Sequence, residues 1–199
     1  MQILAVLQFS AHDMISCTRE EMRVRSSSVR RLVLSGLFLA LGLVMPFLTG
    51  QIPSIGSMLL PMHIPVLICG FVCGWPYGLA VGFITPLLRH WIFGMPPMPN
   101  AVAMAFELAV YGFCTGLFHK LLPKKNVFVY VSLILSMICG RIVWGIASLV
   151  IYGLTDKAFT WQMFAAGAVV NAIPGIILQI VIIPPIIIAL RRGNLLKDG

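Results

Sequence analysis

A few ionisable side chains lie in or beside the apolar runs of this sequence, and these residues could do chemistry. They are Arg89, His90, Glu107 and Arg141, with His63 at the start of a run. Ionisable groups are costly inside a membrane, and those that occur there are functional candidates by default. An arginine fork binds carboxylates in a two-pronged geometry. The set therefore favours recognition of a small polar or anionic ligand.

The depths of these residues bring them together in the outer half of a bilayer. A helix rises about 1.5 Å per residue, which places Glu107 about 10 Å and Asn171 about 15 Å below the outer ends of their runs. The same rise puts Arg141 roughly 22 Å above the inner end of its run, and Arg89 lies near the outer end of another. The other candidates for ligand contact at this level are His63, His90, Trp91, Asn100 and Trp144.

A purely structural interpretation is also open. Glu107 and Arg141 could pair only to hold the helices together, with Arg89 reaching the outer headgroups. This explains the pair, but it explains less well why Asn171 lies at the same depth. Pro174 cannot donate a hydrogen bond to the carbonyl of the residue four positions earlier, so an acceptor is freed beside Asn171. That proline fits a ligand cavity or a simple packing kink equally well.

Enzyme motifs are missing from the sequence. There is no HExxH, no GxSxG and no GxxxxGK[ST], so neither a zinc protease, a serine hydrolase nor ATP hydrolysis by this chain is predicted. Glu107 has no second deep carboxylate as a partner for acid–base work. The spacing of cysteine and histidine predicts no metal site and no cofactor. A membrane enzyme acting on lipid-linked substrates and a structural subunit without a ligand are the alternatives from other classes.

The composition shows which elements must position these residues. Hydrophobic residues make up 59% of the 199 residues, charged residues only 10%, and the mean hydropathy is +0.99. The apolar residues come in long runs rather than in alternation, which predicts an all-α integral membrane protein. The net charge of +8 is typical of basic loops at a lipid bilayer, so no nucleic-acid partner is expected.

Six transmembrane helices are predicted, over residues 31–48, 63–74, 77–93, 101–122, 127–152 and 161–190. The last is expected to be broken at Pro174-Gly175 and at Pro184-Pro185. The membrane domain covers residues 30–190, between an N-terminal tail, 1–29, and a C-terminal tail, 191–199. Residues before Met22 are hypothesised to be an upstream extension. Glycines four apart between residues 70 and 82 would let the second and third helices pack closely as a hairpin.

The positive charges predict that both termini are cytoplasmic. With the N-terminus inside, 11 of the 14 lysines and arginines fall in inner segments. These inner residues are Arg19, Arg23, Arg25, Arg30, Arg31, Lys120, Lys124, Lys125, Arg191, Arg192 and Lys197. The loops 49–62 and 94–100 then face outward.

Three stretches of residues 30–190 are characteristic: LLPMHIPVLICGFVCG (59–74), VGFITPLLRHWIFGMPPMP (81–99) and AVAMAFELAVYG (101–112). With them, residues 30–190 resemble the substrate-binding S components of energy-coupling factor (ECF) vitamin transporters. Within the family these stretches are most similar to pantothenate S components. The resemblance implies a multi-pass protein of a prokaryotic plasma membrane that captures a vitamin at its outer face.

The resemblance also implies partners. Such a protein associates with a transmembrane coupling protein and two cytoplasmic ATPases, which make it topple in the membrane and release its ligand inside. Small residues on the first helix form part of the docking surface, and Gly36 and Ala40 match that pattern only in part, because an alanine pair is commoner.

Pantothenate agrees with the chemistry of the buried groups. Arg89 and Arg141 against Glu107 leave a net charge of plus one at membrane depth, which a ligand carboxylate would compensate. Hydroxyl groups could bind Asn171 or the carbonyl of Val170. The runner-up is the same fold serving a pyridoxine-like vitamer, a pyrimidine precursor or a queuosine precursor.

Overall fold

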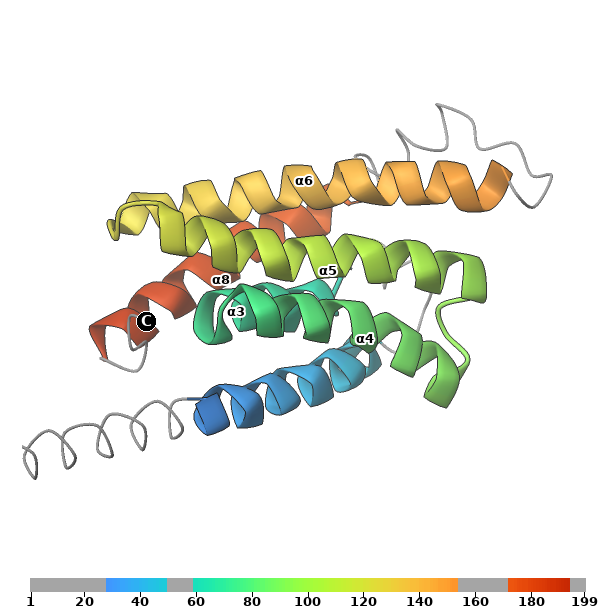
Figure 1. Cartoon of the computed structure of the whole chain (residues 1–199), viewed down its shortest axis with the longest axis horizontal. Coiled ribbons are helices and arrows are strands. Elements are labelled where there is room, and N and C mark those ends of the chain that lie inside the picture. Colours follow the sequence, from blue (N-terminus) through green and yellow to red (C-terminus); the bar gives the residue numbers. More distant parts are fainter. Residues whose placement is uncertain (1–27, 50–58, 154–171, 194–199) are drawn as a thin grey trace, which may run out of the picture.

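The described part of the computed structural model comprises residues 28–49, 59–153 and 172–193, and these ranges contain helices and no strand (Figure 1). The predicted all-α fold is thus confirmed for these ranges. The elements are a first helix, Ser28–Phe47, overlapping the 3-10 turn η1 (Met45–Thr49), and then α3 (His63–Cys73), α4 (Trp75–Phe93), α5 (Met98–Leu121), α6 (Asn126–Gly153) and α8 (Ile173–Arg192).

Four of the described helices are long and apolar enough to cross a membrane alone: the first helix, α5, α6 and α8. Helix α3 has 11 residues and is therefore about 16 Å long, roughly half of a hydrocarbon core. The prediction of six transmembrane helices is therefore met only in part: the described ranges hold six helices, and four of them are long and apolar enough to span.

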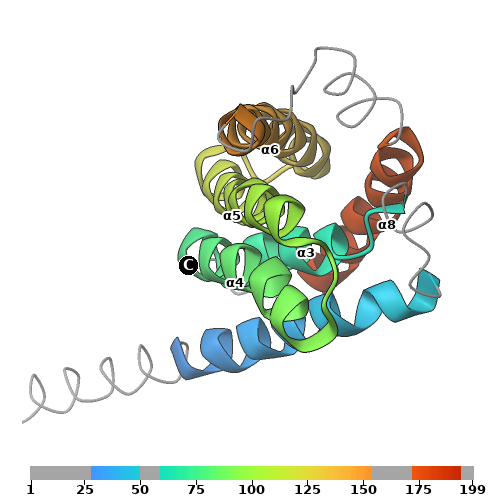
Figure 2. The same cartoon turned by 90° about the vertical axis from the view of Figure 1, so that its right-hand side faces the viewer.

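Helix α3 occupies the centre of the bundle. Viewed along the bundle, it lies with α4 and the first helix on one side, α5 and α6 on another, and α8 on a third (Figure 2). Ten of its 11 residues are buried, among them His63. A helix enclosed on all sides can be apolar all round, which is why the sequence of α3 shows no polar face.

Glycines let α3, α4 and α5 approach backbone to backbone. A Cβ atom added to Gly112 of α5 would lie 2.1 Å from the carbonyl oxygen of Gly78 in α4. A Cβ on Gly70 of α3 would lie 2.6 Å from the carbonyl oxygen of Gly112, and one on Gly78 would lie 2.9 Å from the Cα of Gly70. The expected close packing of the second and third helices is confirmed, and α5 is the third partner in it.

Prolines have different effects along α8. Pro174 lies in its first turn, where the missing N–H costs nothing. The expected break at Pro184-Pro185 is wrong, because α8 continues through both residues to Arg192. In hydrocarbon a fully broken turn would leave several backbone groups without partners, so a helix keeps its remaining hydrogen bonds around a proline.

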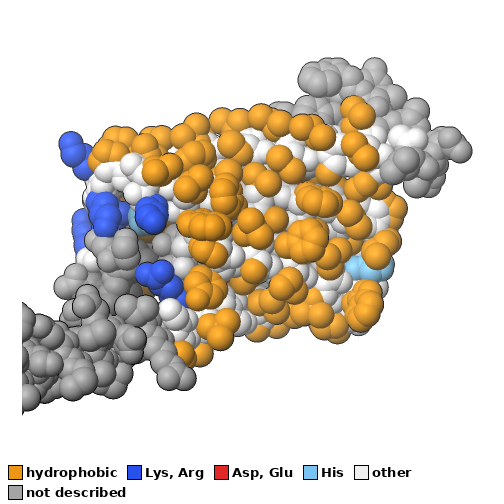
Figure 3. All heavy atoms as spheres, viewed as in Figure 1, with side chains coloured by type: hydrophobic (Ala, Val, Ile, Leu, Met, Phe, Trp, Pro, Cys, Tyr) orange, Lys and Arg blue, Asp and Glu red, His pale blue; other side chains and the backbone are white. Residues whose placement is uncertain are grey.

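The surface is divided between apolar and basic side chains. Hydrophobic side chains cover most of the face seen in Figure 3, and lysines and arginines gather at the end where α5 leads into α6. Exposed hydrophobic residues include Ile138 and Ile142 of α6, which are 52% and 54% exposed. Such a surface suits lipid tails along the bundle and water or headgroups at its basic end.

Candidate ligand site

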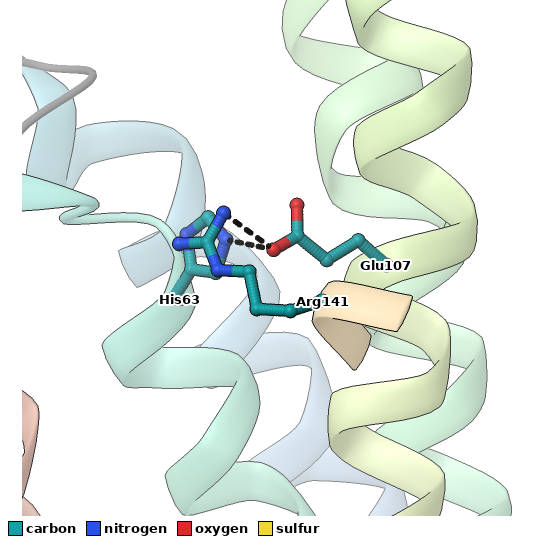
Figure 4. Close-up of polar contacts among 3 residues, drawn as sticks. All are labelled: His63, Glu107 and Arg141. Carbon is teal, nitrogen blue, oxygen red and sulfur yellow. Dashed lines mark ion pairs between the residues drawn. The ribbon is translucent and has the colours of Figure 1, made fainter. Parts of the chain in front are cut away.

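Glu107 of α5 and Arg141 of α6 form an ion pair inside the bundle. Arg141 Nη1 lies 3.1 Å from Glu107 Oε1, and His63 Nε2 lies 3.6 Å from the same oxygen (Figure 4). The side chains of His63 and Glu107 are 1% and 2% exposed, whereas that of Arg141 is 13% exposed. The depth argument that placed Glu107 and Arg141 at one level agrees with this contact.

Packing around Tyr111 positions the three side chains. The ring of Tyr111, one turn after Glu107, meets the ring of His63 edge to face with centroids 5.4 Å apart. Gly140 lies directly against this ring, because a Cβ there would be 2.2 Å from Tyr111 Cε1. The missing side chain brings α6 close to α5, and the next residue of α6 is Arg141. His63 is fixed at the start of α3, where its backbone N–H donates to the carbonyl of Leu60 at 3.0 Å.

Several buried polar atoms of this cluster have no hydrogen-bond partner among the described residues. They include Arg141 Nε and Nη2 and both ring nitrogens of His63. Glu107 Oε1 makes ion-pair contacts but no hydrogen bond of good geometry. A buried donor without a partner costs about 1–3 kcal/mol. The cluster can therefore accept a polar ligand, and Arg141 offers it the Nε–Nη2 edge while its Nη1 faces Glu107.

Arg89 lies in a different contact. Its Nη1 donates to the carbonyl of Leu43 at 2.6 Å, and its guanidinium carbon lies 5.4 Å from the ring centroids of both Phe47 and Phe93. Arg89 is 4% exposed and so joins α4 to the end of the first helix. The three charges expected in a single site are therefore found in two places. Arg141 pairs with Glu107, and Arg89 contacts Leu43 and two phenylalanine rings elsewhere.

Other predicted site residues lie outside the cluster around Glu107. His90 Nδ1 is 2.7 Å from the carbonyl oxygen of Pro96, which ties the end of α4 to the following loop. Trp91 is 84% exposed, as expected for an aromatic side chain at a membrane interface. The hydroxyl of Tyr152 donates to Asn100 Oδ1 at 3.1 Å and so joins α6 to α5. Trp144 is partly buried on α6, one turn after Arg141, and Asn171 lies outside the described residues.

The sequence of this bundle matches a known family over most of its length. The family described as ECF transporter, substrate-specific component matches residues 30–187. The chain belongs to this family. Searches of curated proteins and of solved structures find no match.

Family membership identifies the general role of the protein. An ECF substrate-specific component is the membrane-embedded, substrate-binding subunit of a transporter, and it associates with the ECF module. It is a transporter subunit rather than an enzyme. The sequence-based assignment to this family is confirmed.

Two polar residues of the substrate-specific component were missed by sequence reasoning. Gln179 of α8 is 1% exposed, and neither its Nε2 nor its Oε1 has a hydrogen-bond partner in the described part of the chain. Ser148 of α6 is fully buried, two turns after Arg141, and its hydroxyl is likewise unpartnered there. The sequence does show Gln179 as a single amide in the otherwise apolar run of α8. It was missed because only ionisable groups were considered in that run.

Proposed function

We propose that this substrate-specific component captures a vitamin that carries a carboxylate, with pantothenate as the best candidate. The observation that carries the proposal is the buried Nε–Nη2 edge of Arg141, which has no described partner while Nη1 faces Glu107. A carboxylate accepts two parallel hydrogen bonds from such an edge. Glu107 engages Nη1 alone and so leaves the Nε–Nη2 edge for a ligand carboxylate.

The remaining groups suit the uncharged part of pantothenate. His63 and Gln179 offer buried donors and acceptors for hydroxyl and amide groups. Asn171 and the carbonyl of Val170 are further candidates on sequence grounds. A flavin or a folate needs broad aromatic surfaces for stacking. Trp91, one of the few tryptophans, is turned to the outside, which favours a compact ligand over a planar one.

A thermal-shift screen of the purified chain against the water-soluble vitamins tests this function. A ligand at 100 times its dissociation constant should stabilise the protein by about 2.7 kcal/mol. Pantothenate is expected to raise the melting temperature, with the other vitamins and precursors as controls. A shift given only by a pyridoxine-like vitamer, a pyrimidine precursor or a queuosine precursor would reassign the ligand. No shift with any compound would contradict the vitamin-binding role.

The proposed partners are a transmembrane coupling protein and two cytoplasmic ATPases, with both termini in the cytoplasm. The support for this orientation is the cluster of positive charges at one end of the bundle (Figure 3). In a cysteine-free background, Met95→Cys should react with an impermeant maleimide from outside intact cells. Lys125→Cys should react only after the cells are opened. The reverse pattern would invert the topology.

Gly36 and Ala40 are proposed to form part of the docking surface for the coupling protein. Both are exposed on the first helix, and a Cβ added to Gly36 meets no atom within 4 Å. Small side chains let another helix approach closely. Gly36→Leu and Ala40→Leu should therefore reduce copurification of the coupling protein and leave ligand binding unchanged. Ala189→Leu, at an exposed alanine of α8, is the matched control. Normal copurification with both first-helix variants would remove this face from the interface.

A further inference from the structure

The basic end of the bundle gathers lysines and arginines from several parts of the chain. Glu107 is the one carboxylate in the described ranges, and it is engaged with Arg141 and His63 inside the bundle. The described cations at this end are Arg30, Arg31, Lys120, Lys124, Lys125, Arg191 and Arg192. Like charges held together repel one another, so such an end favours the binding of an anion.

A hollow of about 200 Å³ opens within this end, between the α3–α4 turn and the end of α5. Its basic lining comes from three separate parts of the chain: Arg31 of the first helix, His119 and Lys120 of α5, and Lys124 of the loop that follows. The fold therefore brings these basic residues together from separate segments. The volume of the hollow leaves room for several water molecules, and so for a phosphate group.

The backbone gives the hollow a fixed wall. Gly74 has φ 92°, a conformation that favours glycine, and it turns the chain from α3 into α4. This turn lies directly on α5, because a Cβ added to Gly116 would be 2.3 Å from the backbone nitrogen of Trp75. The ring of His119 meets that of Phe71 edge to face at 5.2 Å. These contacts hold the basic residue His119 in place beside the turn.

The lining combines basic and apolar side chains. Phe71, Val72, Trp75 and Tyr77 line it together with the cations, and Trp75 is 41% exposed. Aromatic residues of this kind mark the level where lipid headgroups meet the acyl region. A basic pocket between helices at the end of a membrane bundle suits the phosphate of an anionic headgroup.

We propose that this hollow is a binding site for a phosphate group, supplied by an anionic phospholipid of the adjacent leaflet. Lys120, Lys124 and Arg31 bind the phosphate oxygens, and the wall of Phe71 and Trp75 contacts the glycerol and upper acyl region. The site is separate from the ligand cluster around Glu107, and it does not depend on the identity of the transported molecule. A free phosphate has the same charged group but cannot use the apolar wall.

Native mass spectrometry of the delipidated full chain in detergent tests the proposal. The probes are phosphatidylglycerol, phosphatidylcholine and inorganic phosphate. Phosphatidylglycerol should bind more tightly than phosphatidylcholine, and the double variant Lys120→Gln/Lys124→Gln should weaken its binding about 25-fold, since each basic residue near an anionic surface contributes roughly fivefold. Both lysines are exposed, so the variant should fold, which its melting temperature without lipid verifies.

The matched control is Lys125→Gln/Arg192→Gln, which removes the same charge from exposed residues that do not line the hollow. This control should lose clearly less phosphatidylglycerol binding than the Lys120→Gln/Lys124→Gln variant, because neither of its residues lines the hollow. Equal losses in the two double variants would show a non-specific attraction and overturn the proposal. Binding of inorganic phosphate that is as strong as that of the lipid and depends on Lys120 and Lys124 would keep the phosphate site and overturn its assignment to a lipid. No preference for either anionic probe would refute both.

Discussion

Replacing Arg141 with lysine should leave the protein folded and weaken pantothenate binding by about ten- to a hundredfold. Lysine keeps a positive charge beside Glu107, so the buried carboxylate retains a counter-ion. An ammonium cannot reproduce the Nε–Nη2 edge that is free of described partners in Arg141. Hydrogen bonds to a charged group contribute about 1.5–3 kcal/mol, which corresponds to the expected loss. Ligand titration and melting temperature should be measured together.

The control for this variant is Arg89→Lys, the same chemical change at an arginine that contacts Leu43 and two phenylalanine rings. It should preserve affinity and lower stability only slightly. Arg141→Ala should instead lower the melting temperature strongly, because removing one partner of a buried pair costs about 3–5 kcal/mol. If Arg141→Lys bound pantothenate with full affinity and Arg89→Lys did not, the carboxylate would belong to Arg89. Full affinity in both would end the case for an anionic vitamin.

Replacing Gly112 with alanine should destabilise the bundle by several kilocalories per mole or prevent its assembly. The new methyl group would lie 2.1 Å from the carbonyl oxygen and 2.3 Å from the carbonyl carbon of Gly78, both backbone atoms of a packed helix. Overpacking of a core costs about 1–3 kcal/mol even where side chains can adjust. Here α4 and α5 would have to separate, so the cost should be at the upper end or beyond. Thermal unfolding in detergent measures it.

Gly36→Ala is the matched control, since a Cβ at Gly36 meets no atom within 4 Å. An exposed glycine inside a helix is less favourable than alanine by about 0.5–1 kcal/mol, so this variant should be neutral or slightly more stable. The two substitutions are chemically identical and differ only in what faces the methyl group. Equal melting temperatures for both variants would show that α4 and α5 do not approach as closely as Gly78 and Gly112 indicate.

The helices could be predicted from the apolar runs and from the glycines, prolines and polar residues between them. The exact ends of the helices depended on the prolines. The sequence predicts a helix from residue 101, whereas α5 begins at Met98, because Pro99 in a first turn loses no hydrogen bond. Conversely, Pro184-Pro185 predicts a break that α8 does not make. The tendency of proline to break helices is known from helices in water. In a membrane no water is present to bind the backbone groups of an opened turn, so the helix continues.

The sequence predicts how deep in the membrane the site residues lie, but not which neighbouring helix each side chain faces. Counting residues gives the height of a side chain along its helix, and this places Glu107 and Arg141 correctly at one level. It does not give the angle around the helix axis. Arg89 lies one turn after Thr85, on the face of α4 where Thr85 Cγ2 would be 2.8 Å from a Cβ on Gly42 of the first helix. That packing turns Arg89 toward the first helix.

Gln179 shows a second limit of the sequence. Nothing in its type distinguishes an amide that faces lipid from one that faces a core, and a polar residue among isoleucines is compatible with either. The neighbouring contacts decide: Ile183, one turn later, packs in the same core cluster as Ile64 and Leu67 of α3. Gln179 is therefore turned inward with Ile183, which only the assembled bundle reveals.

The concentration of cations at one end has a mechanical consequence. A charged side chain avoids the hydrocarbon core by extending to the water boundary. Moving one to the bilayer centre costs at least about 2.5–3.5 kcal/mol. Seven of them in the described ranges hold that end at the water boundary. A large reorientation of the protein is therefore expected to keep the basic end near the water boundary. The opposite end of the bundle, where α4 meets α5, should then move further than the basic end.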